Sequence, residues 1–350
     1  MRIVIDAMGG DHAPSATIEG ALQALDETNS SELEIILVGR EDGLREQLGR
    51  KHSHMSRLHV QHAEEVVSMK ESPTKAVRHK TKSSIAVGIN LLKSDEADAF
   101  ISAGNTGAVL ASSLLSLGRI KGVNRPTIGA YMPTPSHGCV MFDVGANPDA
   151  KPVNLLQFAI MGSIYARYIL DIPEPRVGLV NIGEERTKGT DVVIDAYGMI
   201  EQEVPNFVGN IEGRDILSGK VDVVVCDVFV GNVLLKFGES IFYSLSDMVK
   251  SEISDKPFAT IGALLMKPVI NNLSREFNYE EYGGVPLLGI NGVSVICHGS
   301  SSSKAVKNAV GVAQTMVQER INDVIQQELE AHQVPSPSMP QVDDPLIPQG

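Results

Sequence analysis

MRIVIDAMGGDHAPSATIEGALQALD, residues 1–26, contains the pattern that decides the fold. It begins with a short apolar run, Arg2–Ala7, turns through Gly9 and Gly10, and continues into a helical pattern over residues 15–26. A run that is apolar throughout is typical of a strand covered on both faces. The stretch therefore predicts a buried strand, a glycine-rich loop and a helix.

The same alternation recurs along the chain. Further strands are predicted at residues 34–39, 57–61, 97–102, 127–132, 140–144, 176–182, 207–211 and 221–227, and helices at 106–117, 153–170, 190–202, 232–253 and 302–331. This order predicts an α/β fold with a largely parallel sheet. No linker clearly divides the chain, so we expect one folded domain over residues 1–332. The polar, Pro-rich residues 333–350 predict a disordered tail.

Composition narrows the class of protein. The chain has 350 residues, 43% of them hydrophobic and 21% charged, with a formal net charge of -13. That charge argues against nucleic-acid binding, because phosphate backbones favour basic surfaces. Cys139, Cys226 and Cys297 lie far apart, which indicates neither a disulfide framework nor a zinc site. Such cysteines fit a reducing cytosol. No apolar run is long enough to predict a membrane-spanning helix.

Four loops that follow predicted strands are rich in Gly, Asn, Ser or Asp, and ligands of such sheets bind at the carboxyl ends of strands. They are DAMGGDHAP at 6–14, ISAGNTGA at 101–108, FDVGANPDAKP at 142–152 and CHGSSSSKAV at 297–306. The second and fourth precede helices, where backbone N–H groups bind anions. The predicted phosphate-binding residues are Ser102, Gly104, Asn105, Thr106, Ser300 and Ser301. The same residues would also suit simple helix capping.

The residues of these loops also suggest two other kinds of chemistry. Asp143, Asn147 and Asp149 crowd one turn, as ligands of a hard metal ion do, but turns favour these residues in any case. We therefore expect no metal site. Cys297 beside His298 suggests a thiol nucleophile, but adjacent residues of a strand point to opposite faces and pair poorly.

The motifs together are similar to those of a known family. MRIVIDAMGGDHAP, ISAGNTGA, GRIKGVNRP, FDVGANPDAKP, VGLVNIGEERTKG, VDVVVCDVFVGNVLLK, YGGVPLLGI and HGSSSSKAV occur in family order. Over residues 1–330 the chain resembles the bacterial phosphate acyltransferases of phospholipid synthesis. The resemblance makes residues 1–332 one catalytic domain.

This resemblance implies a reaction and a set of partners. Acyl carrier protein would donate a long acyl chain to inorganic phosphate, and a membrane glycerol-3-phosphate acyltransferase would use the acyl phosphate. The implied fold is a three-layer α/β/α sandwich related to phosphotransacetylases and isocitrate-type dehydrogenases. The implied assembly is a homodimer without a metal or nucleotide cofactor.

Roles for individual residues follow from that reaction. Phosphate must be held beside the thioester carbonyl, and the developing oxyanion must be stabilised. We assign phosphate to the nest at Gly104 with the serines of the fourth loop as a second clamp. The predicted catalytic residues are His298 or His12 as the base, Lys188 as a cation, and Asn232 or Asn147 as the oxyanion donor.

Acyl carrier protein is acidic, so its docking surface should be basic. One candidate is Lys75, Arg78 and Lys82, which share a helical face if the helix is continuous. The other is Arg119, Lys121 and Arg125 in GRIKGVNRP. A solvated charged face is the alternative for both.

Residues 256–272 contain an apolar helical stripe formed by Phe258, Ile261, Leu264 and Leu265. Such a stripe commonly belongs to a core helix. The resemblance and the lipid-soluble product favour a helical tip that touches the membrane surface, which gives a cytoplasmic protein peripherally associated with the membrane.

Three alternative functions stay open. A phosphotransacetylase-like enzyme would use coenzyme A as the acyl carrier. A metal-dependent dehydrogenase would need a nicotinamide site and acidic metal ligands, and no convincing set is present. A non-catalytic module would bind carrier protein or lipid without releasing free thiol.

Overall fold

The computed structural model describes residues 1–28, 32–49, 56–135, 137–254, 256–276 and 281–332. The strands are β1 (Arg2–Asp6), β2 (Glu34–Gly39), β3 (Leu58–His62), β4 (Ala99–Ser102), β5 (Thr127–Met132), β6 (Cys139–Phe142), β7 (Val177–Val180), β8 (Phe207–Ile211), β9 (Val223–Val225), β10 (Val285–Leu288) and β11 (Val293–Ile296). The α-helices are α1 (Ser15–Glu27), α2 (Glu41–Leu48), α3 (Pro73–His79), α4 (Ser84–Lys93), α5 (Thr106–Leu117), α6 (Pro152–Ile169), α7 (Asp191–Glu203), α8 (Val228–Ser254), α9 (Pro257–Glu276), α10 (Ser303–Gln318) and α11 (Ile321–Ala331).

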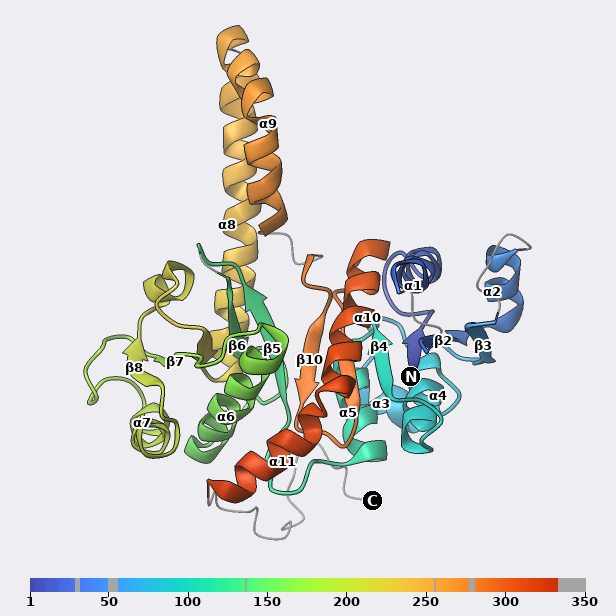
Figure 1. Cartoon of the computed structure of the whole chain (residues 1–350), viewed down its shortest axis with the longest axis horizontal. Coiled ribbons are helices and arrows are strands. Elements are labelled where there is room, and N and C mark those ends of the chain that lie inside the picture. Colours follow the sequence, from blue (N-terminus) through green and yellow to red (C-terminus); the bar gives the residue numbers. More distant parts are fainter. Residues whose placement is uncertain (29–31, 50–55, 136, 255, 277–280, 333–350) are drawn as a thin grey trace.

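The strands form one sheet in the order β3-β2-β1-β4-β11-β10-β5-β6-β9-β7-β8 (Figure 1). The first five run parallel to one another. β10 is antiparallel to β11 and to β5, and β6 is antiparallel to β5. The last four strands, β6, β9, β7 and β8, are parallel among themselves but run against the first five. The sheet thus consists of two parallel groups of opposite strand direction, and the antiparallel strands β10 and β5 lie between these groups.

Side chains of the buried strands alternate between two hydrophobic layers, as the two-residue period of a strand requires. Ile3 and Ile5 of β1 join a core with α1, α6, α7, α10 and α11, whereas Val4 joins a core with α3, α4 and α5. Helices therefore cover both faces of the sheet (Figure 1). The predicted α/β/α sandwich with a largely parallel sheet is confirmed.

The structure differs from the predicted elements at two informative places. β10 and β11 were not predicted, because each is only four residues long and Pro286 and Gly292 interrupt the apolar pattern between residues 285 and 296. The predicted helix at 302–331 is two helices, because Arg320 adopts a left-handed conformation with φ 51°. The break turns α11 onto α6.

Helices α8 and α9 form a hairpin that projects far beyond the sandwich (Figure 1). α8 begins four residues before its predicted start, and the Asp227 carboxylate accepts a hydrogen bond from the Val230 N–H at 2.9 Å. A cap of this kind satisfies one of the unpaired N–H groups of a helix start. No helix among the described residues is both long and apolar enough to cross a membrane.

Candidate functional site

Three of the four predicted loops meet at one edge of the sheet. They follow β1, β4 and β11, which are neighbouring parallel strands, so their carboxyl ends lie side by side. The Asp11 N–H donates to the Gly299 carbonyl at 2.7 Å. A Cβ on Gly10 would lie 3.1 Å from the Ala103 Cβ, so this loop also touches the one after β4. We call these three connected loops, residues 7–14, 103–105 and 297–302, the nest edge.

Three helices, α1, α5 and α10, begin at the nest edge. Each directs the partial positive charge of its N-terminus, and its first unpaired N–H groups, toward that edge. Thr106, the first residue of α5, is exposed, and Ser301 is buried just before α10 begins. The edge is therefore suited to an anion, as the sequence predicts.

The Asp6 carboxylate connects the loop after β1 to the end of β4. It is buried and accepts hydrogen bonds from the Ser102 hydroxyl at 2.7 Å and the Met8 N–H at 3.1 Å. The Ser102 hydroxyl in turn accepts the Gly104 N–H at 3.0 Å. A Cβ on Gly9 would lie 2.6 Å from the Gly104 nitrogen, so only glycine permits this approach. Burial raises the pKa of Asp6.

These hydrogen bonds leave Ser102 and Gly104 poorly placed for direct contact with phosphate. The Ser102 hydroxyl donates to Asp6 and is completely buried, and the Gly104 N–H is directed at that hydroxyl. Both groups therefore stabilise the conformation of the loop after β4 and are not directed at a bound phosphate. The sequence could not separate this supporting role from direct phosphate contact, because both need short polar residues at the end of a strand.

The Asn105 side chain also makes its hydrogen bonds within the protein. Its Oδ1 accepts the Ala108 N–H at 3.0 Å and so caps α5. Its Nδ2 donates to the carbonyls of Ser68, Met69 and Glu71 at 3.1, 3.2 and 2.9 Å. Asn105 therefore caps α5, which is the alternative role that the sequence allowed. Its side chain also binds a segment distant in sequence, residues 68–71, to the nest edge.

His298 is exposed and lies in the loop after β11. Its Nδ1 is 2.7 Å from the Ser300 hydroxyl oxygen, and the Ser300 N–H donates to the same nitrogen at 3.3 Å. His12 is also exposed, in the neighbouring loop after β1, where its carbonyl accepts the Ala16 N–H. Both imidazoles that the sequence proposed as bases belong to the nest edge.

The structure does not bring Asn147, Asn232 and Lys188 to the nest edge. They belong to loops that follow β6, β9 and β7, and these strands run against β4. Asn147 Nδ2 donates to the Pro126 carbonyl at 2.7 Å, beside the amino end of β5. The loop after β6 therefore lies at the opposite edge of the sheet from the other three, because the β5–β6 hairpin reverses the chain direction.

Asn147 and Asn232 instead stabilise the loop after β6. The buried Asp143 carboxylate accepts the Asn147 N–H at 2.8 Å and the Asn147 Nδ2 at 2.7 Å, and also the Ile128, Gly145 and Ala146 N–H groups. Asn232 Nδ2 donates to the Val144 carbonyl at 2.9 Å. Lys188 is exposed, and its carbonyl accepts from Asn181.

The two basic clusters lie at different ends of α5. Pro73, at the start of α3, packs against Gly107 at the start of α5, so α3 lies beside the nest edge. Lys75 and Arg78 are exposed on α3. The condition for Lys82 to share their helical face, a continuous helix, is not met, because α3 ends at His79.

Hydrogen bonds and ion pairs occupy several of the remaining basic residues. Lys82 pairs with Glu64 at 3.1 Å. In the second cluster, which follows the end of α5, Lys121 pairs with Glu330 at 3.3 Å and Arg119 donates to the Asn124 carbonyl. Arg125, in the same loop, is half-buried. A helix of twelve residues is about 18 Å long, so this cluster is distant from the nest edge.

The cysteines are unsuited to nucleophilic chemistry. All three are buried, and burial raises the pKa of Cys139 and of Cys297 to about 12. A thiol with such a pKa stays protonated near neutral pH and is a weak nucleophile. Among the described residues, no cluster of His, Cys, Asp or Glu has an arrangement that would hold a metal ion.

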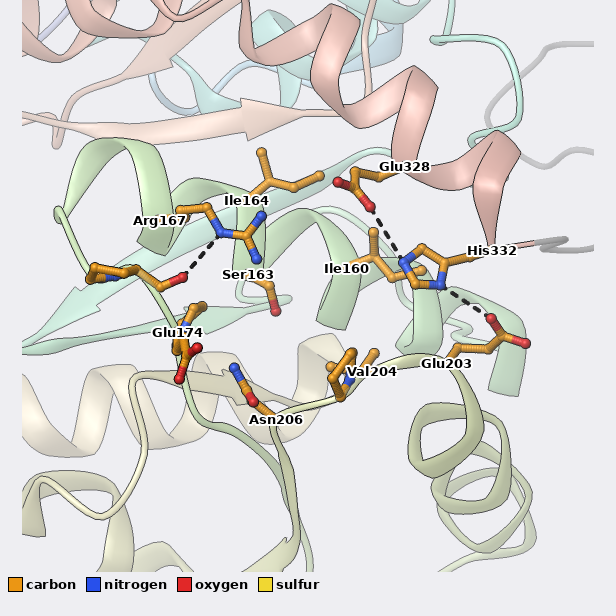
Figure 2. Close-up of a pocket in the computed structure, with 13 residues that line it drawn as sticks. Ile160, Ser163, Ile164, Arg167, Glu174, Glu203, Val204, Asn206, Glu328 and His332 are labelled. Atoms are coloured by element: carbon orange, nitrogen blue, oxygen red, sulfur yellow. Dashed lines mark hydrogen bonds and ion pairs between the residues drawn. The ribbon is translucent and has the colours of Figure 1, made fainter.

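A hollow of about 350 Å³ lies elsewhere, between α6, α7 and α11 (Figure 2). On one side the His332 ring lies between Glu203, at 3.2 Å, and Glu328, at 3.5 Å. On the other, Arg167 Nε donates to the Pro173 carbonyl at 3.3 Å. None of the residues predicted for the site lines this hollow.

Solved structures define the class of fold. A phosphotransacetylase from Streptococcus pyogenes superposes with a TM-score of 0.60 at 17% identity, covering 91% of this chain and 94% of that one. The 4-hydroxythreonine-4-phosphate dehydrogenase of Klebsiella pneumoniae gives a TM-score of 0.50 at 13% identity, with 91% and 98% covered. The protein therefore has the α/β/α architecture that phosphotransacetylases and this dehydrogenase share.

Sequence comparison defines the family. A family described as "Fatty acid synthesis protein" matches residues 1–324. The phosphate acyltransferase of Heliobacterium modesticaldum is 51% identical over 330 residues, covering 94% of this chain and 98% of its own. The chain belongs to this family of phosphate acyltransferases and is an acyltransferase enzyme, as its motifs predicted.

Proposed function

We propose that the protein transfers a long acyl chain from acyl carrier protein to inorganic phosphate and so supplies acyl phosphate for phospholipid synthesis. The observation that carries this proposal is the nest edge, where the starts of α1, α5 and α10 lie on three touching loops, one of which contains exposed His298. A phosphate oxygen attacks the thioester carbonyl, the C–S bond breaks, and the thiolate leaves with the carrier protein. Family membership supports an acyl transfer, and the nest supports phosphate as the acceptor.

Within this site, we assign phosphate to the N–H groups at the start of α5, near Thr106, and to the Ser300–Ser301 loop before α10, whose own contacts with His298 would rearrange around the anion. His298 accepts the proton that phosphate loses, and His12 is the second candidate base. Backbone N–H groups of the two helix starts are also suited to the oxyanion of the tetrahedral intermediate. Asn147, Asn232 and Lys188 have no direct part in this scheme, because they lie at the other edge of the sheet.

The carrier protein docks on α3 in this proposal. Lys75 and Arg78 are exposed beside the nest edge, whereas Lys121 of the second cluster is distant and paired with Glu330. An acidic carrier would be drawn to the first surface by charge. Coenzyme A is the alternative donor, because solved neighbours of this fold are phosphotransacetylases.

The projecting hairpin supports a peripheral association with the cytoplasmic membrane face. Leu264 and Leu265 of α9 are 68% and 77% exposed, which argues against the core-helix interpretation of this stripe. The side chains of Phe258 and Ile261 lie outside the described residues. Shallow insertion of exposed leucines would bring the enzyme close to the membrane acyltransferase that consumes its product.

The same hairpin supports a homodimer. One face of α8 exposes a large apolar residue at almost every turn: Phe229, Val233, Phe237, Ile241, Leu245 and Met248. Contiguous exposed apolar surface of this length is unusual for a monomer and marks an interaction site. We assign this α8 stripe to the same stripe of a second copy, which would place two tips at the membrane.

The reaction is tested by incubating the protein with palmitoyl-acyl carrier protein in EDTA, with and without phosphate, and measuring free thiol and acyl phosphate. Thiol release should require phosphate and should match acyl phosphate formation. Release that ignores phosphate, or that EDTA abolishes, contradicts the proposal. A parallel reaction with palmitoyl-coenzyme A distinguishes the two donors.

A further inference from the structure

The segment that Asn105 fastens crosses the nest edge. It begins with Ser68, beside the start of α5, and Met69 reaches the loop before α10, where a Cβ on Gly299 would lie 2.9 Å from the Met69 methyl carbon. Residues 68–71 therefore lie against both the second and the third loops of the nest edge. This segment lies outside the four loops rich in Gly, Asn, Ser or Asp.

Several hydrogen bonds hold this segment in place from its own side. The Lys80 ammonium donates to the Val66 carbonyl and to the Glu71 carboxylate, both at 2.7 Å. Glu71 also accepts the Ser68 N–H at 3.2 Å. Together with the three bonds from Asn105, these contacts hold the backbone of the segment, so that the Met69 Cα is kept at the nest edge.

Met69 is 46% exposed in this fixed position. A lone exposed methionine on a protein surface needs no explanation. Met69, however, lies at the rim of a polar, anion-binding edge, on a backbone that a neighbouring side chain ties down with three hydrogen bonds. Methionine is flexible and polarizable and adapts to apolar ligands of varying shape. An apolar side chain makes no hydrogen bond to phosphate, whereas it can pack against the acyl chain of a thioester.

We propose that Met69 is a specificity-determining contact for the acyl chain next to the thioester, and that Asn105 is the positioning residue that holds Met69 at the nest edge. The proposal rests on the proposed function and deepens it by assigning the apolar side of the same site. Phosphate occupies the helix N-termini, and the first carbons of the acyl chain pack against Met69.

The test measures binding separately from turnover. The dissociation constants of palmitoyl-acyl carrier protein and of unacylated carrier protein are measured without phosphate, for wild type and Met69→Ala. The variant should bind the palmitoyl form about tenfold more weakly, which corresponds to about 1.4 kcal/mol. Its affinity for the unacylated carrier should stay within about twofold. Leu115→Ala is the matched control, since Leu115 is 52% exposed near the far end of α5.

Asn105→Ser tests the positioning role. Serine is a good helix cap, so α5 keeps its start, but its hydroxyl cannot make the three bonds to the segment. The variant should lose affinity for the palmitoyl form as Met69→Ala does. The double variant should be little worse than either single one, because both changes remove the same contact. Circular dichroism and thermal unfolding check that each variant folds.

Three outcomes overturn the inference: unchanged palmitoyl affinity in Met69→Ala, equal weakening of both carrier forms, or an Asn105→Ser variant that alters only the phosphate requirement. The last result would make Asn105 a phosphate contact. Failure of the proposed function has a different signature, which is the absence of phosphate-dependent thiol release by the wild type. Binding of the acylated and unacylated carriers still decides the role of Met69 in that case.

Discussion

The nest edge and the α8–α9 hairpin depart from ordinary protein surfaces in opposite ways. At the strand ends that support the nest edge, polar groups such as Asp6 and Ser102 are buried and hydrogen-bonded to one another. On the hairpin, apolar side chains such as Phe237 and Leu265 are exposed over most of its length. The polar groups of the first region find their partners within the same chain, whereas the apolar groups of the hairpin are left exposed to solvent. In the proposed scheme, binding of the small substrate and assembly of the dimer therefore depend on separate parts of the molecule.

The largest effect on stability is expected from Asp6→Ala. The change leaves the Ser102 hydroxyl and the Met8 N–H without their acceptor, and orphaned buried groups cost about 1–3 kcal/mol each. We expect the free energy of unfolding, measured by urea titration, to fall by about 3 kcal/mol. Leu265→Ala on the hairpin should change it by less than about 0.5 kcal/mol. Equal losses in the two variants would erase the proposed difference between the regions.

The next largest effect is expected on the rate. His298→Gln should lower kcat by about a hundredfold, because a general base contributes about 10²–10⁴ to the rate. The KM for phosphate should change little, since the helix N-termini remain. Steady-state kinetics with His12→Gln as the matched control separates the two candidate bases. Near-normal turnover in His298→Gln would move the role to His12 or show that no protein base is needed.

A smaller effect is expected from charge on the hairpin tip. Replacing Leu264 and Leu265 with Glu should reduce flotation with anionic liposomes by about tenfold, which corresponds to about 1.4 kcal/mol of lost membrane affinity. Thermal stability in solution should not change, because both side chains are already exposed. Thr260→Glu adds charge to the same hairpin without removing an apolar group and should float nearly as wild type does. Unchanged flotation of the double variant would refute membrane contact.

The smallest effect concerns pH and the segment that carries Met69. The hydrogen bond from Lys80 holds the pKa of Glu71 below its usual value. Because the folded pKa is lowered, the stabilising effect of the pair is present above the unfolded pKa and is lost as pH falls through the folded one. Lys80→Met should raise the pKa of Glu71 toward its usual value in an NMR titration. A Glu71 pKa that stays low in this variant would assign the shift to the Ser68 N–H instead.

The sequence predicted the layers of the fold because their signals are local. Apolar runs such as Arg2–Ala7, followed by glycine-rich loops and helical periodicity, are each contained within about thirty residues. The same local signals located the loops at Ser102 and His298, which the structure brings together. They also placed an apolar stripe at Leu264, although periodicity could not tell a core helix from an exposed one.

What the sequence by itself determined is thus the α/β class, the family and the glycine-rich and serine-rich loops, because each depends on short runs of residues. Tertiary structure alone decided which loops share an edge. The β5–β6 hairpin reversed half of the sheet and removed Asn147 and Lys188 from the nest edge, and the short strand β11 placed the loop of His298 next to the loop after β4. It also decided that Asn105 binds a segment more than thirty residues away. Strand direction and distant hydrogen bonds depend on partners that are far apart in the chain, so no local pattern records them.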